Sequence, residues 1–150
     1  MTVAIGQPMP QCSIPATSGL TFSPASAKGK KLVLYFYPKD ETKVCTDQAC
    51  SFRDRYQDFQ DLGATVIGVS SDSVQSHQKF TKKHHLPFLL LADETKKLQQ
   101  LFGVKKDLFG LIPGRVTYVA DKNGIVQMVF SSMSSQIHIT KALALLKKNV

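Results

Sequence analysis

Two cysteines, Cys45 and Cys50, lie five residues apart in the stretch "PKDETKVCTDQACSFRD". Thr42 stands just before a helical pattern, so it is a candidate N-cap and Cys45 falls in the first helical turn. Free backbone N–H groups and the positive end of the helix dipole favour a thiolate there. Cys45 is therefore placed where a nucleophilic or redox-active thiol is expected.

The spacing of these two cysteines does not suit a fixed disulfide. On an α-helix, residues five apart are rotated by about 140° and their Cα atoms are roughly 8.6 Å apart. A disulfide requires Cα atoms within about 7 Å. The two sulfurs can bond only if the first helical turns unwind. Cys45 and Cys50 are thus either two unrelated thiols that fill apolar space or a conformational redox switch.

The elements around the cysteines form a strand–helix–strand unit. Residues 31–37, "KLVLYFY", and 64–70, "ATVIGVS", are apolar runs that predict strands buried on both faces. Between them, Gly63 ends a helix whose apolar face is formed by residues at helical spacing: Cys45, Ala49, Phe52, Tyr56 and Phe59. A unit of this kind favours parallel pairing of its strands.

The rest of the chain adds further helices and a hairpin. Helical patterns cover 73–85, 94–102 and 135–149, and an apolar run follows the first of them. The runs "RVTYVA" and "IVQMVF" flank "DKNG" at 121–124, which predicts a β-hairpin. Residues 1–30 are rich in Gly, Pro and Ser. These patterns predict one α/β domain over residues 1–150, with a mixed central sheet flanked by helices.

Composition narrows the classes of function. The chain has 150 residues and three cysteines, too few for a disulfide scaffold. No apolar run approaches the ~20 residues that span a membrane, and the N-terminus does not read as a secretory signal. The cytoplasm, where thiols are mostly reduced, is the expected compartment. The cysteines and histidines lack metal-ligand spacing, so neither a metal nor another cofactor is expected.

The net charge of +8 would be compatible with a protein that binds nucleic acid. The lysines occur in twos and threes spread along the chain, and the only arginines are Arg53, Arg55 and Arg115. No basic tract is formed. A solvated basic surface is therefore the preferred interpretation, and we expect neither nucleic acid nor membrane as a partner.

The residues around Cys45 resemble the peroxiredoxins, specifically the PrxQ or bacterioferritin-comigratory-protein class. The peroxidatic motif of this family, P-x-x-x-T/S-x-x-C after a buried strand, reads "PKDETKVC" here, with Pro38, Thr42 and Cys45. "CTDQACSFRD" is similar to the segment that carries the resolving cysteine, Cys50. "GRVTYVADKNG" supplies the active-site arginine, Arg115, and "IGQPMPQCSIP" resembles the N-terminal motif, so the likeness covers almost the whole chain.

The resemblance implies a thioredoxin fold and a thiol peroxidase. Cys45 would reduce hydrogen peroxide or an organic hydroperoxide and become a sulfenic acid, with which Cys50 would condense. Thioredoxin, or alternatively glutaredoxin, would reduce the disulfide, and the class implies a monomer. Thr42 would offer its hydroxyl to the thiolate and the peroxide. Arg115 would supply a fixed cation, and Pro38 would shield the pocket from water.

Three positions depart from the pattern of this family. Val44 stands where many members of the Q class have glycine, but other peroxiredoxins place valine there, so we interpret it as tolerated. Cys12 stands where a phenylalanine is common, and we interpret it as a buried filler. Gln48 replaces a common glutamate, which removes a negative charge near the active site.

Two other classes of function remain as alternatives. A redox sensor would use the same thiol switch but react once and signal to a partner. A thioredoxin-like disulfide oxidoreductase is disfavoured because the sequence lacks a C-x-x-C motif.

Overall fold

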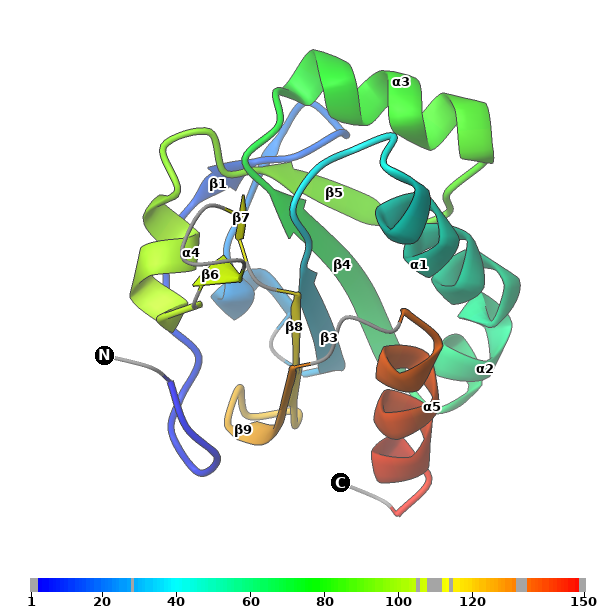
Figure 1. Cartoon of the computed structure of the whole chain (residues 1–150). Helices are drawn as coiled ribbons and strands as arrows, with labels where there is room; N and C mark the ends of the chain where they lie inside the picture. Colours follow the sequence, from blue (N-terminus) through cyan, green and yellow to red (C-terminus); the bar gives the residue numbers. More distant parts are fainter. Residues whose placement is uncertain are drawn as a thin grey trace.

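A five-stranded mixed sheet forms the centre of the molecule (Figure 1). The computed structural model describes residues 3–27, 29–104, 106–107, 112–113, 115–131 and 135–148. The strands are arranged in the order β5 (Leu89–Ala92), β4 (Ala64–Ser70), β3 (Lys31–Phe36), β8 (Val116–Ala120) and β9 (Val126–Ser131). β3, β4 and β5 are parallel, and β8 and β9 are antiparallel additions. The predicted mixed sheet and thioredoxin fold are confirmed.

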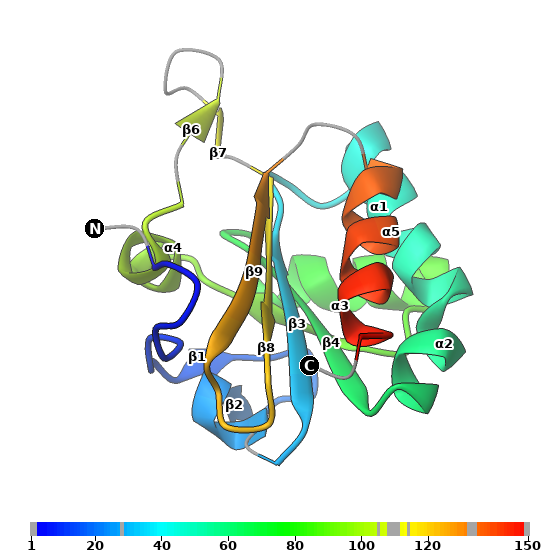
Figure 2. The ribbon, with the colours of Figure 1, turned by 90° about the horizontal axis from the view of Figure 1, so that it is seen from below.

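Helices cover both faces of this sheet (Figure 2). On one side lie the two helices that follow β3, α1 (Lys43–Asp54) and α2 (Tyr56–Asp61), together with α3 (Val74–His84) and α5 (Ser135–Leu146). α4 (Lys97–Phe102) and the N-terminal segment lie on the other side. The sheet therefore separates two hydrophobic clusters.

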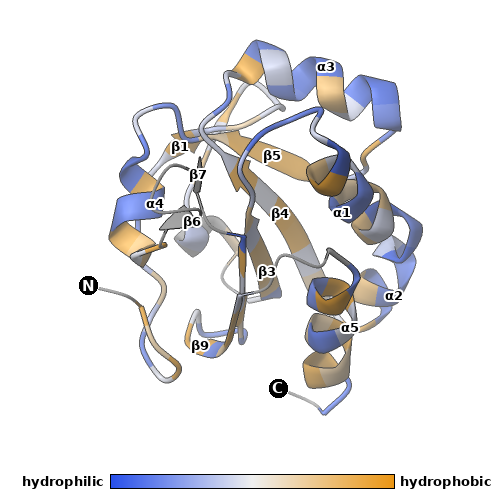
Figure 3. Ribbon diagram, viewed as in Figure 1, coloured by the Kyte–Doolittle hydropathy of each residue, from blue (hydrophilic) through white to orange (hydrophobic). Residues whose placement is uncertain are grey.

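The alternation of side chains along β3 divides the core between these clusters. Val33 and Tyr35 pack into the cluster under α1 and α5, which also contains Cys45. Leu34 and Phe36 pack into the opposite cluster. Because both faces of the strand are covered, the run is mostly apolar, and the hydropathy colouring shows β5 as orange and β4 as orange with paler segments (Figure 3).

The helix predicted between the first two long strands is divided in two. Arg55, with φ −107° and ψ 11°, leaves the helical conformation and separates α1 from α2. Phe52 and Phe59, one on each side of the break, are both fully buried, with ring centroids 5.5 Å apart. The pattern predicted the buried face correctly but not the break within it.

The next two helices are close to their predicted ranges. α3 begins after Ser73, whose hydroxyl accepts the Ser76 N–H at 3.1 Å, and it ends at the left-handed His85. α4 starts three residues later than predicted, because the Asp93 carboxylate accepts the backbone N–H groups of Leu98 and Gln99. A buried carboxylate thus acts as the cap of that helix.

Short elements complete the chain. β1 (Ile14–Pro15) pairs with β2 (Thr21–Phe22), a 3-10 helix covers Pro24–Ala27, and β6 (Lys106–Asp107) pairs with β7 (Ile112–Pro113). The predicted hairpin joins β8 to β9, closed by a hydrogen bond from the Gly124 N–H to the Asp121 carbonyl. Within the described residues, none of the helices has both the length and the apolar character needed to span a bilayer.

Candidate active site

Cys45 and Arg115 meet at the carboxyl end of β3. Cys45 lies in the first turn of α1, which follows β3, and its side chain is 1% exposed. Arg115 directly precedes β8, and the antiparallel register places Val116 opposite Phe36, the last residue of β3. This register brings the Arg115 Nη2 atom within 3.4 Å of Cys45 Sγ, to which it donates a hydrogen bond. A buried cation facing a sulfur suits a thiolate nucleophile.

Gln48, one turn further along α1, orients the same guanidinium. Its Oε1 atom accepts a hydrogen bond from Arg115 Nη1 at 2.6 Å, and both side chains are buried. The glutamine at this position therefore preserves a side-chain link to the arginine, as a neutral acceptor. Among the described residues, Arg115 Nε has no hydrogen-bond partner. Within the described part of the chain, the Nε–H donor of the guanidinium is thus unused and can serve a further oxygen atom.

Thr42 is the N-cap residue of α1, as predicted, but its side chain does not cap the helix. Its backbone is extended, with φ −78° and ψ 151°, and its hydroxyl donates to the Lys39 carbonyl at 2.9 Å. The first-turn N–H groups are therefore not satisfied by the hydroxyl of Thr42. With its proton directed to Lys39, that hydroxyl presents lone pairs to any incoming donor.

Pro38 follows the end of β3 and begins the loop that leads to Thr42. It is half-buried, and the preceding residue, Tyr37, still bonds through its N–H to the Val69 carbonyl at 3.0 Å. A proline at this point adds no backbone donor to the edge where Cys45 lies. The strand, the loop and the helix start therefore bring the residues of the predicted motif to one end of the sheet.

Cys50 lies apart from Cys45, against a different helix. Both thiols are free, and Cys50 is half-buried with its Sγ atom 3.9 Å from His84 Nδ1 at the end of α3. Burial raises the pKa of the Cys50 thiol above its usual value. The intact helix α1 thus separates the two sulfurs, in line with the geometry expected from their spacing.

Comparisons with known proteins identify the family of this chain. Residues 5–129 match the AhpC/TSA family, and the chain is 48% identical over 146 residues to chloroplastic peroxiredoxin Q of Sedum lineare, covering 97% of this chain and 78% of that one. This chain belongs to the peroxiredoxin family, in its Q class.

Solved structures of peroxiredoxins superpose on the chain over nearly its full length. Peroxidoxin BcpB of Mycobacterium tuberculosis is 32% identical, covers 96% of both chains and has a TM-score of 0.88. A Xanthomonas campestris bacterioferritin comigratory protein with alkyl peroxide reduction activity is 30% identical, with a TM-score of 0.85 over 92% of this chain and 91% of that one.

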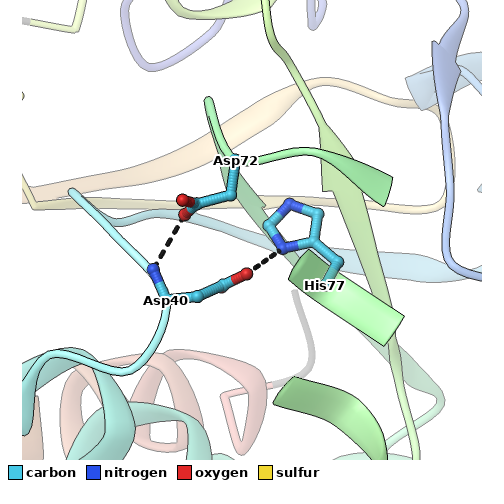
Figure 4. Close-up of side chains that lie close together, drawn as sticks. All are labelled: Asp40, Asp72 and His77. Atoms are coloured by element: carbon cyan, nitrogen blue, oxygen red, sulfur yellow. Dashed lines mark hydrogen bonds and ion pairs between the residues drawn. The ribbon is translucent and has the colours of Figure 1, made fainter. Parts of the chain in front are cut away.

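This peroxiredoxin also has a buried polar network beside its cysteine loop (Figure 4). Asp40, in the loop between Pro38 and Thr42, accepts the Tyr37 hydroxyl at 2.6 Å, and its second oxygen lies 2.7 Å from His77 Nδ1 on α3. The Asp40 N–H donates to Asp72 Oδ2 at 2.8 Å. The loop before Cys45 is therefore fixed to α3 and to the loop between β4 and α3.

The proton count in this network follows from its geometry. His77 Nε2 lies 2.8 Å from the Leu91 carbonyl, which only accepts, so Nε2 carries a hydrogen. One further proton must then lie between His77 Nδ1 and the Asp40 carboxylate. Asp40, Asp72 and His77 have ligand atoms within 4.8 Å of one another. Protein hydrogen bonds already hold these groups, so the cluster has a structural explanation without a metal.

This network was not among the features predicted from the sequence. The available signal was His77, a polar residue three positions before the buried Phe80 on the inner face of α3. Its partner Asp40 belongs to a loop 37 residues away, and no local pattern connects the two.

The third cysteine of this peroxiredoxin lies on the other side of the sheet. Cys12 is partly buried against the cluster that contains Leu34 and Phe36, whereas Cys45 belongs to the cluster under α1 and α5. This packing agrees with the interpretation of Cys12 as a filler of apolar space.

Proposed function

We propose that this peroxiredoxin is a thiol peroxidase whose single AhpC/TSA-like domain spans residues 1–150 and in which Cys45 is the peroxidatic residue. The Cys45 sulfur attacks one oxygen of the peroxide, and the second oxygen leaves as water or an alcohol. The observation that carries this assignment is the 3.4 Å hydrogen bond from Arg115 to a sulfur that is buried in the first turn of a helix.

Three neighbouring residues support the peroxide step. Arg115 holds the sulfur through Nη2 and retains Nε as a donor for a peroxide oxygen, where it stabilises developing negative charge. The Thr42 hydroxyl, which donates to Lys39, accepts the peroxide O–H through a lone pair. Pro38 closes the loop side of the site without offering a competing N–H.

Cys50 is the resolving residue in this proposal. The Cys45 sulfenic acid and the Cys50 thiol form a disulfide and release water. Because α1 separates the sulfurs, its first turns must open in each cycle. A thioredoxin-type protein, with glutaredoxin as the alternative, then attacks the disulfide and restores both thiols.

The proposal extends to substrate, assembly and compartment. We propose hydrogen peroxide and organic hydroperoxides as substrates, and the alkyl peroxide reduction activity of the Xanthomonas relative supports the second class. The protein is proposed to act as a monomer in the cytoplasm. The Sedum relative, by contrast, is chloroplastic.

A turnover assay tests the peroxidase proposal. The reduced protein is mixed with hydrogen peroxide or cumene hydroperoxide in the presence of NADPH, thioredoxin and thioredoxin reductase. We expect sustained NADPH consumption that is abolished by Cys45→Ser and retained by Cys12→Ser. Equal peroxide reactivity of Cys45→Ser and wild type would disprove the assignment. A single round of oxidation by every reductant tried would instead identify a redox sensor.

A further inference from the structure

The resolving thiol has a proton acceptor in direct contact with it. Cys50 Sγ lies 3.9 Å from the Nδ1 atom of His84, the last residue of α3, within hydrogen-bonding range for sulfur. The contact is held in place by a second link between the helices, since Arg53 Nη1 donates to the His84 carbonyl at 2.7 Å. The two helices therefore present this imidazole to this thiol.

The other side of the imidazole determines which nitrogen carries its hydrogen. His84 Nε2 lies 3.2 Å from Glu41 Oε1. Lys83 donates to Glu41 Oε2 at 2.9 Å, and this hydrogen bond lowers the pKa of Glu41, so the carboxylate only accepts at neutral pH. Nε2 must then be the donor, and a neutral His84 directs the lone pair of Nδ1 at Cys50 Sγ.

Glu41 occupies its position at a conformational cost. Its φ of 65° is in the left-handed region, which residues other than glycine rarely adopt. This backbone turn lies between Asp40, fixed to α3 through His77, and Thr42, the N-cap of α1. The anchored loop thus delivers a carboxylate to the end of α3 beside Cys50.

The chemistry of resolution requires such a base. Burial raises the pKa of the Cys50 thiol, with Asp47 and Asp54 adding to the effect and Arg53 opposing it. At neutral pH Cys50 is therefore mostly a thiol, whereas the thiolate is the nucleophile that attacks a sulfenic acid. On α3, the ring of Phe80 packs against the imidazole of His84, with ring centroids 5.1 Å apart, and brings no charge to it.

We propose that Glu41, His84 and Cys50 form a catalytic relay for the resolving step, in which His84 takes the thiol proton of Cys50. The transfer occurs while α1 is folded, so that Cys50 is already a thiolate when α1 opens and its contact with His84 on α3 is broken. Its sulfur then bonds to the Cys45 sulfur as the S–O bond of the sulfenic acid breaks. The departing hydroxide takes up a proton and becomes water, and His84 returns its proton to solvent. Glu41 is a positioning residue that fixes the tautomer.

This relay rests on the proposed function, and a single-turnover experiment separates the two. Reduced protein is mixed with one equivalent of hydrogen peroxide, quenched in acid at intervals, alkylated and weighed intact. Fully reduced chains carry three alkyl groups because the chain has three cysteines, and the disulfide form carries one. Dimedone added to parallel samples marks the sulfenic acid.

His84→Gln is expected to oxidise Cys45 at the wild-type rate but to form the disulfide at least about tenfold more slowly, because general-base assistance is lost. Its rate of disulfide formation should rise about tenfold per pH unit across the neutral range, since only the ionised fraction of Cys50 attacks. Wild type should show a shallower dependence. Among the described residues, the charged or titratable groups around Cys50 and His84 that also affect this pH dependence are Glu41, Lys83, Arg53, Asp47 and Asp54.

Three further substitutions, at two positions, control the experiment. His85→Asn removes the adjacent exposed histidine at a left-handed position that asparagine tolerates, and it should resolve at the wild-type rate. Glu41→Ala should slow resolution several-fold, and Glu41→Gln should restore it, because an amide oxygen still accepts from His84 Nε2. These Glu41 variants keep the proposal testable if His84→Gln folds poorly.

The outcomes distinguish the relay from the peroxidase proposal. Disulfide formation by His84→Gln with the wild-type rate and pH profile overturns the relay while leaving Cys45 and Cys50 in their roles. Wild-type protein that accumulates sulfenic acid but never joins Cys45 to Cys50 overturns the resolving assignment itself, and the relay with it.

Discussion

The guanidinium of Arg115 donates a hydrogen bond to the sulfur of Cys45 across 3.4 Å, although 70 residues separate the two in the chain. The antiparallel pairing of β8 with β3 makes this possible, because it brings the start of one strand beside the end of the other. The reactivity proposed for Cys45 thus depends on sheet register as much as on the helix that carries it.

Arg115→Lys should lower the second-order rate constant for hydrogen peroxide by about 100-fold. A lysine ammonium cannot reproduce the fork of donors that holds Cys45 and Gln48 together. Competition with a haem peroxidase for hydrogen peroxide measures the rate. Arg55→Lys changes an exposed arginine that forms an ion pair with Asp58 on the surface, and it should leave the rate unchanged. A rate for Arg115→Lys within threefold of wild type would contradict the role given to the guanidinium.

Gln48→Leu should reduce both stability and peroxide reactivity. It leaves a buried N–H of Arg115 without its acceptor, at a cost of about 1–3 kcal/mol. Gln48→Glu keeps an acceptor in place and should retain both properties, since a carboxylate also bonds to the guanidinium. Urea unfolding and peroxide competition on the two variants measure these effects. Equal losses in both would show that the 2.6 Å bond has no part in positioning Arg115.

Asp40→Ala should destabilise the protein by about 3–5 kcal/mol, because it leaves a buried imidazole without its partner. The loop that leads to Cys45 would also lose its attachment to α3, and peroxide reactivity should fall. Asp58→Ala, at an exposed surface pair, should change the free energy of unfolding by less than about 0.5 kcal/mol. Comparable unfolding midpoints for the two variants would argue against the anchoring role of the network.

Oxidation by one equivalent of peroxide should lower the helical circular dichroism signal and increase proteolysis within residues 42–55. Formation of the disulfide requires α1 to open, which strains the bonds from Arg53 to the His84 carbonyl and from Gln136 to Ser51. Reduction should restore the signal. Cys50→Ser, which forms no disulfide with Cys45, provides the control. Identical spectra of reduced and oxidised wild type would exclude helix opening.

Stability should decrease at alkaline pH because of buried tyrosines. Burial raises the pKa of Tyr118 to about 12 and also raises the pKa values of Tyr35 and Tyr37. The folded state therefore retains protons that the unfolded chain loses above about pH 10. The free energy of unfolding is fully preserved below that pH and falls as pH rises toward 12, by up to about 1.4 kcal/mol per unit for each tyrosine. Urea unfolding between pH 9 and 12 should show a shallower decline for Tyr118→Phe.

The parts of the fold that could be predicted are those in which one local pattern determines the outcome. The apolar runs of β3 and β4 identified buried strands, and the cap and stripe of α1 placed Cys45 at a helix start. The break at Arg55 was missed because the apolar stripe continues across it. Burial patterns record which side chains face inward, not whether the backbone between them stays helical.

The polar contacts of the site were harder to predict for a different reason. Asp40 meets His77, and Glu41 meets His84, only because a loop and a helix far apart in sequence pack together. The resemblance to the family identified Arg115 and Cys45, because each residue stands in a segment that resembles a family motif. It gives no equivalent information about α3, whose histidines were visible in the sequence but had no assigned partners.

The position of Cys12 has a consequence for pairing fidelity. A thiolate that attacks the Cys45 sulfenic acid must reach it from the side of the sheet where α1 lies, and Cys12 packs against the opposite cluster. The central sheet thus separates Cys12 from Cys45. In the proposed cycle, opening the first turns of α1 exposes Cys45 to Cys50 and to solvent while Cys12 stays on the other side of the sheet. In this cycle, the positions of the thiols on the two sides of the sheet favour the Cys45–Cys50 disulfide over any pairing with Cys12.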